Sequence, residues 1–263
     1  EIYQCDWSSD VCSSDLKLKG FCVGCGSPML ARCGEIRVNH WAHLRKLRCD
    51  PWWENETDWH RSWKNQFPTD WQEIVHSAEN GEKHIADVKT KDGWVLEFQH
   101  SYIKPEERRS REEFYKRLVW VVDGNRRSKD KKRFFEVLSN SDYRKDYPNL
   151  RATFPEGALF RDWINSSAHV FFDFGEDELW WLLPQSNEYW AFLLPMARNR
   201  FIQFHSKNPS GSENWFENYY KNYDLKPPEI PKSLIRRPTY RDVGSIHPNV
   251  FLDVANNRRR YRF

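Results

Sequence analysis

Two acidic residues, Asp87 and Glu97, lie ten positions apart on either side of a short polar turn. The segment 84–100 alternates polar and apolar residues, and Gly93 offers the positive φ that closes a three-residue hairpin loop over 91–93. In a hairpin with this loop, strand pairing sets Asp87 opposite Glu97. Two opposed carboxylates on an apolar-backed hairpin are typical of a binding site for a hard divalent cation.

Strand alternation sorts the side chains of this hairpin onto two faces. Asp87, Glu97 and Gln99 share one face, and Ile85 lies opposite Gln99 on that face. The apolar residues of the other face are Ala86, Val88, Trp94, Leu96 and Phe98. Because Ile85 is apolar, we expect both faces of the sheet to be covered, where two unpaired carboxylates are costly. Mg²⁺ or Mn²⁺ with water ligands removes this cost and activates water for phosphodiester hydrolysis. The alternative interpretation is a pair of edge acids that face solvent.

A helix is expected from Asp50 to Gln66, because Pro51 suits its first position and Pro68 ends it. One stripe of this helix consists of Trp59, Trp63 and Phe67. A second stripe consists of Glu56, His60 and Lys64. On its own this second stripe is typical of an exposed ion-pair ladder, and it gains a functional interpretation only if the helix packs beside the acidic face of the hairpin.

Cysteine and histidine residues gather between positions 17 and 50. Apart from two cysteines in the first sixteen residues, every cysteine lies in this segment, which favours metal binding in a reducing, cytoplasmic compartment over disulfides. We expect a structural Zn²⁺ whose ligands are Cys22, Cys25, His43 and Cys49. His40 is the substitute for His43, and Cys33 is interpreted as a buried thiol. The alternative is unliganded cysteines and surface histidines.

Strands are expected at 71–76, 84–90 and 94–100. A charged helix follows from Pro105 to about Arg117, and the apolar run 118–122 predicts a buried strand. With the preceding helix, the order is α-β-β-β-α-β. Further expected elements are helices at 128–139 and 154–163 and strands at 169–174, 179–183 and 190–194.

The first sixteen residues lack hydrophobic periodicity and resemble the translation of a sequencing-library adapter. We expect disorder or arbitrary structure in them, with the true N-terminus missing. The expected regions are a leader (1–16), a zinc-binding module (17–50), an α/β core (51–145) and a C-terminal region of unassigned role with a basic tail (146–263).

The charge pattern points to local basic surfaces, since 41 Lys and Arg residues oppose 38 Asp and Glu residues for a net charge of +3. Most of the 105–117 helix is expected to be a charged outer face, but Arg111 and Tyr115 are spaced to contact a nucleic-acid backbone. The basic tail is expected to add salt-dependent affinity. No apolar run is long enough for a membrane-spanning helix.

In chain order, these residues resemble the competence protein CoiA family over about residues 20–125. The matching positions are Cys22, Cys25, His40, His43, Cys49, Glu54, Glu56, His60, Lys64, Ala86–Val88, Glu97–Gln99, Ser101, Arg111, Tyr115, Val119 and Trp120. The resemblance implies an α+β chain with a restriction-endonuclease-like αβββαβ core, the zinc module before it and a mixed C-terminal extension after it.

By this resemblance, Asp87 and Glu97 hold the metal, and Gln99 stands where many such nucleases carry a lysine. Glutamine supplies no positive charge, so Lys64 is expected to substitute, while Glu56 and His60 complete the metal site or position water. The expected function is a metal-dependent DNA endonuclease or exonuclease in DNA uptake, processing or recombination. The alternatives are a non-catalytic DNA-binding protein that keeps the nuclease fold, and a zinc-stabilised protein-interaction scaffold.

Overall fold

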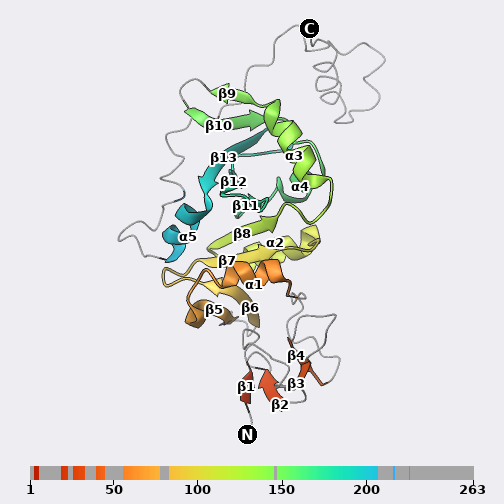
Figure 1. The fold of residues 1–263 in the computed structure, drawn as a ribbon, viewed down its shortest axis with the longest axis vertical. Helices are drawn as coiled ribbons and strands as arrows, with labels where there is room; N and C mark the ends of the chain where they lie inside the picture. The colour runs from red at the N-terminus through yellow and green to blue at the C-terminus, as the bar shows by residue number, and fades with distance from the viewer. Residues whose placement is uncertain are drawn as a thin grey trace.

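The computed structural model describes residues 3–5, 19–22, 26–32, 40–44, 56–77, 83–144 and 147–206, together with Phe216 and Leu225. In these residues a nine-stranded mixed sheet carries most of the fold, and a four-stranded sheet lies at its N-terminal end (Figure 1). The fold class is therefore mixed α/β, as expected. None of the described helices has the length and apolarity of a membrane span.

The strands of the large sheet do not follow chain order. In spatial order they are β5 (Gln72–Ser77), β6 (Lys83–Lys89), β7 (Val95–Gln99), β8 (Leu118–Asp123), β11 (His169–Asp173), β12 (Glu178–Leu182), β13 (Ala191–Ala197), β10 (Tyr147–Thr153) and β9 (Asp142–Arg144). β7, β8 and β11 are parallel, and the other neighbours are antiparallel. The carboxyl ends of three adjacent parallel strands therefore meet at one edge of the sheet.

Helices cover both faces of this sheet, as the apolar Ile85 on the acidic face led us to expect. The helices are α1 (Asp58–Lys64), α2 (Pro105–Phe114), α3 (Asp130–Ser139), α4 (Ala158–Trp163) and α5 (Arg198–Ser206), with a 3₁₀ turn, η2, at Thr69–Trp71. One apolar cluster joins Trp63 of α1 and Phe201 of α5 to the sheet. The cluster on the other face contains Phe134 of α3, Trp163 of α4 and Tyr115, which follows α2. The sheet is thus a buried middle layer.

The α-β-β-β-α-β order is observed as α1, β5, β6, β7, α2 and β8. The expected start of the first helix is wrong, because Glu56 and Thr57 are not helical and α1 begins at Asp58. Thr57 is the N-cap: its backbone is extended, and its hydroxyl oxygen accepts a hydrogen bond from the His60 N–H at 3.3 Å. This bond satisfies one of the helix's first amide groups and fixes where the helix begins. Residues 51–55 lie outside the described residues.

The division between residues 145 and 146 does not mark a structural boundary. β9 and β10 lie on either side of it and pair with each other, and β10 continues through β13 and β12 to β11 beside β8. Residues 147–197 therefore complete the same sheet as the core. The strands β9 and β10 and the helix α5 were not predicted from the sequence.

The small sheet is formed by β1 (Tyr3–Cys5), β2 (Lys19–Cys22), β3 (Pro28–Arg32) and β4 (His40–His43). β1 belongs to the segment interpreted as a leader, and it pairs in parallel with β2. Residues 6–16 lie outside the described residues. Among the described residues of this sheet, Met29, Ala31 and Trp41 are buried apolar side chains.

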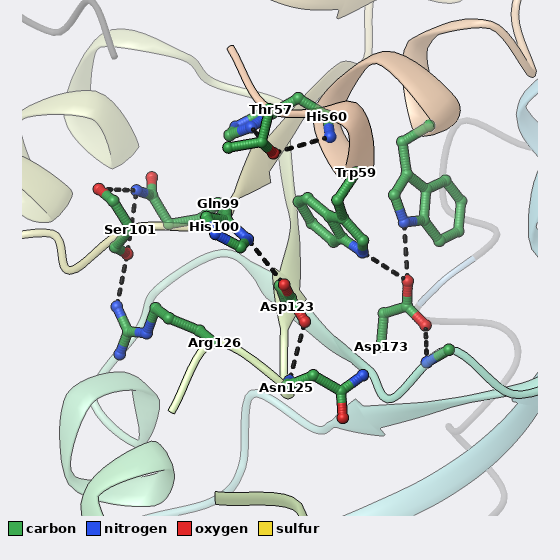
Figure 2. A network of polar contacts seen from close by, with 12 residues as sticks. Thr57, Trp59, His60, Gln99, His100, Ser101, Asp123, Asn125, Arg126 and Asp173 are labelled. Carbon is green, nitrogen blue, oxygen red and sulfur yellow. Dashed lines mark hydrogen bonds and ion pairs between the residues drawn. The ribbon is translucent and has the colours of Figure 1, made fainter. Parts of the chain in front are cut away.

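Asp173, at the carboxyl end of β11, binds Trp59 of α1 (Figure 2) and Arg198 of α5, and so fixes both helices to the sheet. One carboxylate oxygen accepts the indole N–H groups of Trp59 at 3.0 Å and Trp63 at 2.8 Å. The other accepts the Gly175 N–H at 2.8 Å and pairs with Arg198. Asp173 is 1% exposed, and these donors compensate the burial of its charge.

We expect His205 of α5 to make the protein less stable in acid. His205 is 5% exposed, and burial lowers its pKa to about 4, although its Nδ1 lies 2.9 Å from the Phe201 carbonyl oxygen. A histidine with a depressed pKa favours folding above its unfolded pKa near 6.5, and this contribution is lost as the pH falls towards 4. It should remove about 3 kcal/mol from the free energy of unfolding over that range.

Urea unfolding at several pH values between 7 and 4 tests this expectation. His205→Leu removes the titrating group, so its free energy of unfolding should fall less steeply with acidification than that of the wild type. Parallel pH dependences in the two proteins would contradict the assignment.

Candidate functional site

β6 and β7 pair in the register expected from the three-residue loop, with Val88 facing Leu96. Beyond this pair, towards Asp87 and Glu97, hydrogen bonds from backbone N–H groups to side-chain carboxylates replace the regular backbone pairing. The Asp87 carboxylate accepts the Phe98 N–H at 2.8 Å, and the Asp87 N–H donates to Glu97 Oε1 at 3.4 Å. Each carboxylate therefore bonds to the backbone of the facing strand, which makes Asp87 and Glu97 neighbours across the hairpin.

The expected sorting of the hairpin onto two faces is only partly correct. Val88, Leu96 and Phe98 share the cluster beneath α1, but Ala86 belongs to the opposite cluster, with Tyr115. The alternation fails because the ladder opens at Asp87, where side-chain bonds replace backbone pairing. Strict alternation holds only where the strand keeps a regular pleat.

A third carboxylate, Glu73 of β5, joins this pair. The β5–β6 register sets Ile74 opposite Ala86, so Glu73 lies across from Asp87 on the side away from Glu97. Glu73 has a φ of 53°, a left-handed conformation that costs a non-glycine residue about 1–3 kcal/mol. Glu73 was not predicted, because no pairing register between the first two strands was derived from the sequence. Three acids thus lie abreast on adjacent strands.

Lys64, at the end of α1, is the cation of this acidic row. Its ammonium group forms ion pairs with Glu56 and Glu73, and Arg61 also binds Glu56 at 3.1 Å. Lys64 is 4% exposed, so these contacts lie inside the protein. The stripe predicted on the first helix therefore does pack beside the acidic hairpin, although Glu56 reaches it from the residue before the N-cap.

Burial and mutual repulsion shape the charges of this row. Burial opposes charge on Lys64, but Glu73, Asp87 and Glu56 outweigh it and raise the pKa of Lys64. Burial also raises the pKa of Glu73; Lys64 opposes this effect and Asp87 adds to it, leaving a value of about 7. Burial acts in the same sense on Glu56, but Lys64 and Arg61 lower its pKa overall. Lys64 and Arg61 together balance Glu56 and part of the charge of Glu73, which leaves Asp87 as the acid of this row with no cation bonded to it among the described residues.

Arg111 and Tyr115 do not form the exposed nucleic-acid contact expected of them. Arg111 is 5% exposed, donates to Glu97 Oε2 at 3.0 Å and binds Glu107 at 2.7 Å. Tyr115 is 2% exposed and belongs to the apolar cluster beneath α2. The expectation fails because α2 turns both side chains towards the sheet. Arg111 acts instead as a counter-ion of Glu97.

His60 and Gln99 are near the carboxyl edge of β7 (Figure 2). His60 Nδ1 lies 3.1 Å from the Thr57 hydroxyl oxygen, and the Gln99 side-chain amide donates to the Ser101 carbonyl oxygen at 3.3 Å. The rings of His60 and His100 have centroids 6.2 Å apart. The structure therefore brings His60 to this edge beside a second histidine, which sequence analysis did not single out.

The structure describes only part of the expected zinc site. Cys22 of β2 is buried, and His43 of β4 is half-buried, with β3 between these strands. After Cys22 the chain turns back, since the Gly26 N–H donates to the Cys22 carbonyl oxygen at 2.8 Å and Gly26 has a φ of 69°. The expected ligands Cys25 and Cys49 lie outside the described residues, as do Cys33 and the side chain of His40.

The donor chemistry of Asp87 and Glu97 fits Mg²⁺ or Mn²⁺, because such ions favour one or two carboxylates with water. Across the ranges that the structure describes, no three His, Cys, Asp or Glu side chains converge as ligands of one ion. An ion here would therefore be held by these two acids and water, and it would compete with Arg111 for Glu97.

We expect Lys64→Met to lower the free energy of unfolding by about 3–5 kcal/mol, because it leaves buried acids without their shared cation. Adding Glu73→Gln should restore part of this loss by removing one of the repelling charges. Urea unfolding of both single variants and the double variant at pH 7 measures the coupling.

The matched control is the exposed pair Arg109 and Glu106, which are 3.7 Å apart on α2. Removing those charges singly and together should change stability little. Strictly additive effects of the Lys64 and Glu73 substitutions would contradict the buried ion pair.

Comparisons with known proteins give no relative for this chain. No protein-family model matches it, and no match was found among curated proteins or among solved structures.

Proposed function

We propose that the protein is a divalent-metal-dependent DNA nuclease whose metal is held by Asp87 and Glu97. The observation that carries the proposal is the opened β6–β7 ladder, in which each of these two carboxylates bonds to a backbone N–H of the facing strand. Bound there, Mg²⁺ or Mn²⁺ would lower the pKa of a water molecule and offset charge on a phosphodiester. The resemblance to the CoiA family supports DNA as the substrate and a cytoplasmic role in its uptake, processing or recombination.

In this proposal Lys64 supplies the positive charge that Gln99 cannot. Its support is the position of Lys64 at the end of α1, inside the row of acids and close enough to Asp87 for that carboxylate to raise its pKa. Glu73 and Glu56 hold the ammonium group in place. His60 and Gln99 border the same edge and are assigned to the orientation of water or substrate.

We expect Asp87→Asn and Glu97→Gln each to reduce DNA cleavage by about 100-fold or more, because each removes one of the two metal-holding charges. These substitutions keep an oxygen acceptor, so the Phe98 and Arg111 N–H groups retain a partner. The assay compares single- and double-stranded DNA with Mg²⁺ or Mn²⁺. Asp92→Asn, an exposed acid in the turn of the same hairpin, is the control and should cleave as the wild type does.

A non-catalytic DNA-binding protein is the second candidate, and the uncharged Gln99 favours it. In that case the wild type retains DNA in a salt-dependent manner without cleaving it. A protein-interaction scaffold, the third candidate, predicts neither cleavage nor salt-dependent retention. Cleavage by the wild type at the same rate as by the Asn and Gln variants would reject the nuclease proposal.

We also propose that a structural Zn²⁺ stabilises the N-terminal sheet, with Cys22, Cys25, His43 and Cys49 as its ligands. The support is the small number of buried apolar side chains among the residues of this sheet that the structure describes, because modules with little core gain folding free energy from a bound metal. Metal analysis of the purified protein should find about one zinc per chain. Cys22→Ser should abolish it, whereas Ser27→Ala, at the adjacent turn, should not. Absence of zinc from the wild type would refute the site.

A further inference from the structure

The carboxyl edge of the parallel strands carries a second set of ionisable groups, separate from the acidic row. His100 directly follows β7, and Asp123 and Asp173 end β8 and β11. The registers set Gln99 opposite Val122 and Asp123 opposite Asp173, so His100, Asp123 and Asp173 follow one another across the sheet. Active sites of open α/β sheets form at this edge.

His100 and Asp123 form a defined pair within this set (Figure 2). His100 Nδ1 lies 2.7 Å from Asp123 Oδ2, and the Asn125 N–H donates to Asp123 Oδ1 at 2.8 Å. Because an ionised carboxylate only accepts hydrogen bonds, Nδ1 carries the hydrogen in this pair. The second ring nitrogen, Nε2, is then the one that can exchange a proton with a substrate.

The other ionisable groups of this region are held by partners of their own. These pairs are Asp173 with Arg198, Glu97 with Arg111, Lys64 with Glu56 and Glu73, His60 with Thr57, and Arg126 with Asp162. The side chain of His100 is 37% exposed, while that of its partner Asp123 is only 6% exposed. A buried carboxylate thus orients an accessible imidazole, the arrangement found in acid–base catalysis.

Helix α1 relates this pair to the acidic row. Lys64 reaches Glu73 beside Asp87, and His60, one helical turn away, lies against His100. Side chains one turn apart are about 6 Å from each other at Cβ, so the same face of α1 borders both the acidic row and the His100–Asp123 pair. The His100–Asp123 pair lies on the β8 side of β7, whereas Asp87 lies on the β6 side.

We propose that His100, oriented by Asp123, protonates the leaving oxygen when a phosphodiester is cleaved at this site. The inference rests on the proposed nuclease function. At phosphorus, the attacking and leaving oxygens lie roughly in line. Water that attacks from the β6 side therefore expels the leaving oxygen towards β8, where His100 and Asp123 are.

In this step, one proton is released by the attacking water and one is delivered to the leaving oxygen. Water forms the new P–O bond and releases a proton to solvent, while the bond from phosphorus to the 3′ or 5′ oxygen of the deoxyribose breaks. That oxygen takes the proton from Nε2 of the His100 imidazolium, which Asp123 stabilises, and the neutral imidazole regains a proton from solvent.

Substrates with a sulfur leaving atom test the inference directly, because a thiolate departs without protonation. Oligonucleotides carry a single 3′- or 5′-bridging phosphorothiolate and are compared with the all-oxygen sequence for wild type, His100→Ala, Asp87→Asn and His76→Gln. The cleavage rate of His100→Ala should fall about 100- to 10,000-fold on the oxygen linkage and far less on one of the sulfur linkages. Added imidazole should restore part of its rate on the oxygen linkage only.

The other variants separate the possible outcomes. Asp87→Asn should lose activity on oxygen and sulfur linkages alike, and His76→Gln, a β5 histidine in contact with Phe114 and Tyr115, should behave as the wild type. If His100→Ala slows cleavage of the oxygen linkage and of both sulfur linkages equally, or slows none of them, the inference is overturned and the proposed nuclease function stands. A wild type that cleaves neither linkage would overturn both.

Discussion

The position of α1 depends on one buried carboxylate. Asp173 receives two tryptophan N–H groups from α1 and the guanidinium group of Arg198, which begins α5. Because Trp59 and Trp63 bind the same oxygen, the helix is fixed in rotation as well as in position. The two tryptophans point to Asp173, which leaves His60 and Lys64 directed at β7 and the acidic row. The candidate site is thus set by an aspartate of the C-terminal half, more than seventy residues beyond the hairpin.

Around this helix, charge is balanced locally. Lys64 is shared by acids on one side of Asp87, and Arg111 occupies Glu97 on the other. Buried acids without such partners would repel one another and oppose folding. The cations therefore let the chain fold with its acids in place, and they also set the electrostatic competition that an entering metal ion must overcome.

The hairpin was the most predictable feature, because its register follows from local information. A three-residue loop with Gly93 fixed which residues of β6 and β7 face each other. Glu73 could not be found in this way, since the segment between β5 and β6 is longer than the three-residue loop and leaves several registers open to sequence reasoning. Asp173 was equally inaccessible, because its contact with α1 joins residues 110 positions apart. The start of α1 was misjudged since two competing N-caps, Asp50 and Thr57, both have suitable sequences.

The bond from the Phe98 N–H to the Asp87 carboxylate gives Asp87 a structural role as well. Asp87 does for the backbone what a carbonyl oxygen does elsewhere in a sheet, so the hairpin needs it whether or not any reaction takes place. A descendant of this chain that lost its chemistry would still be under pressure to keep an acceptor at position 87. Survival of this aspartate in a related sequence is accordingly a poor marker of activity, and the same holds for Glu97, whose carboxylate accepts the Asp87 N–H and binds Arg111.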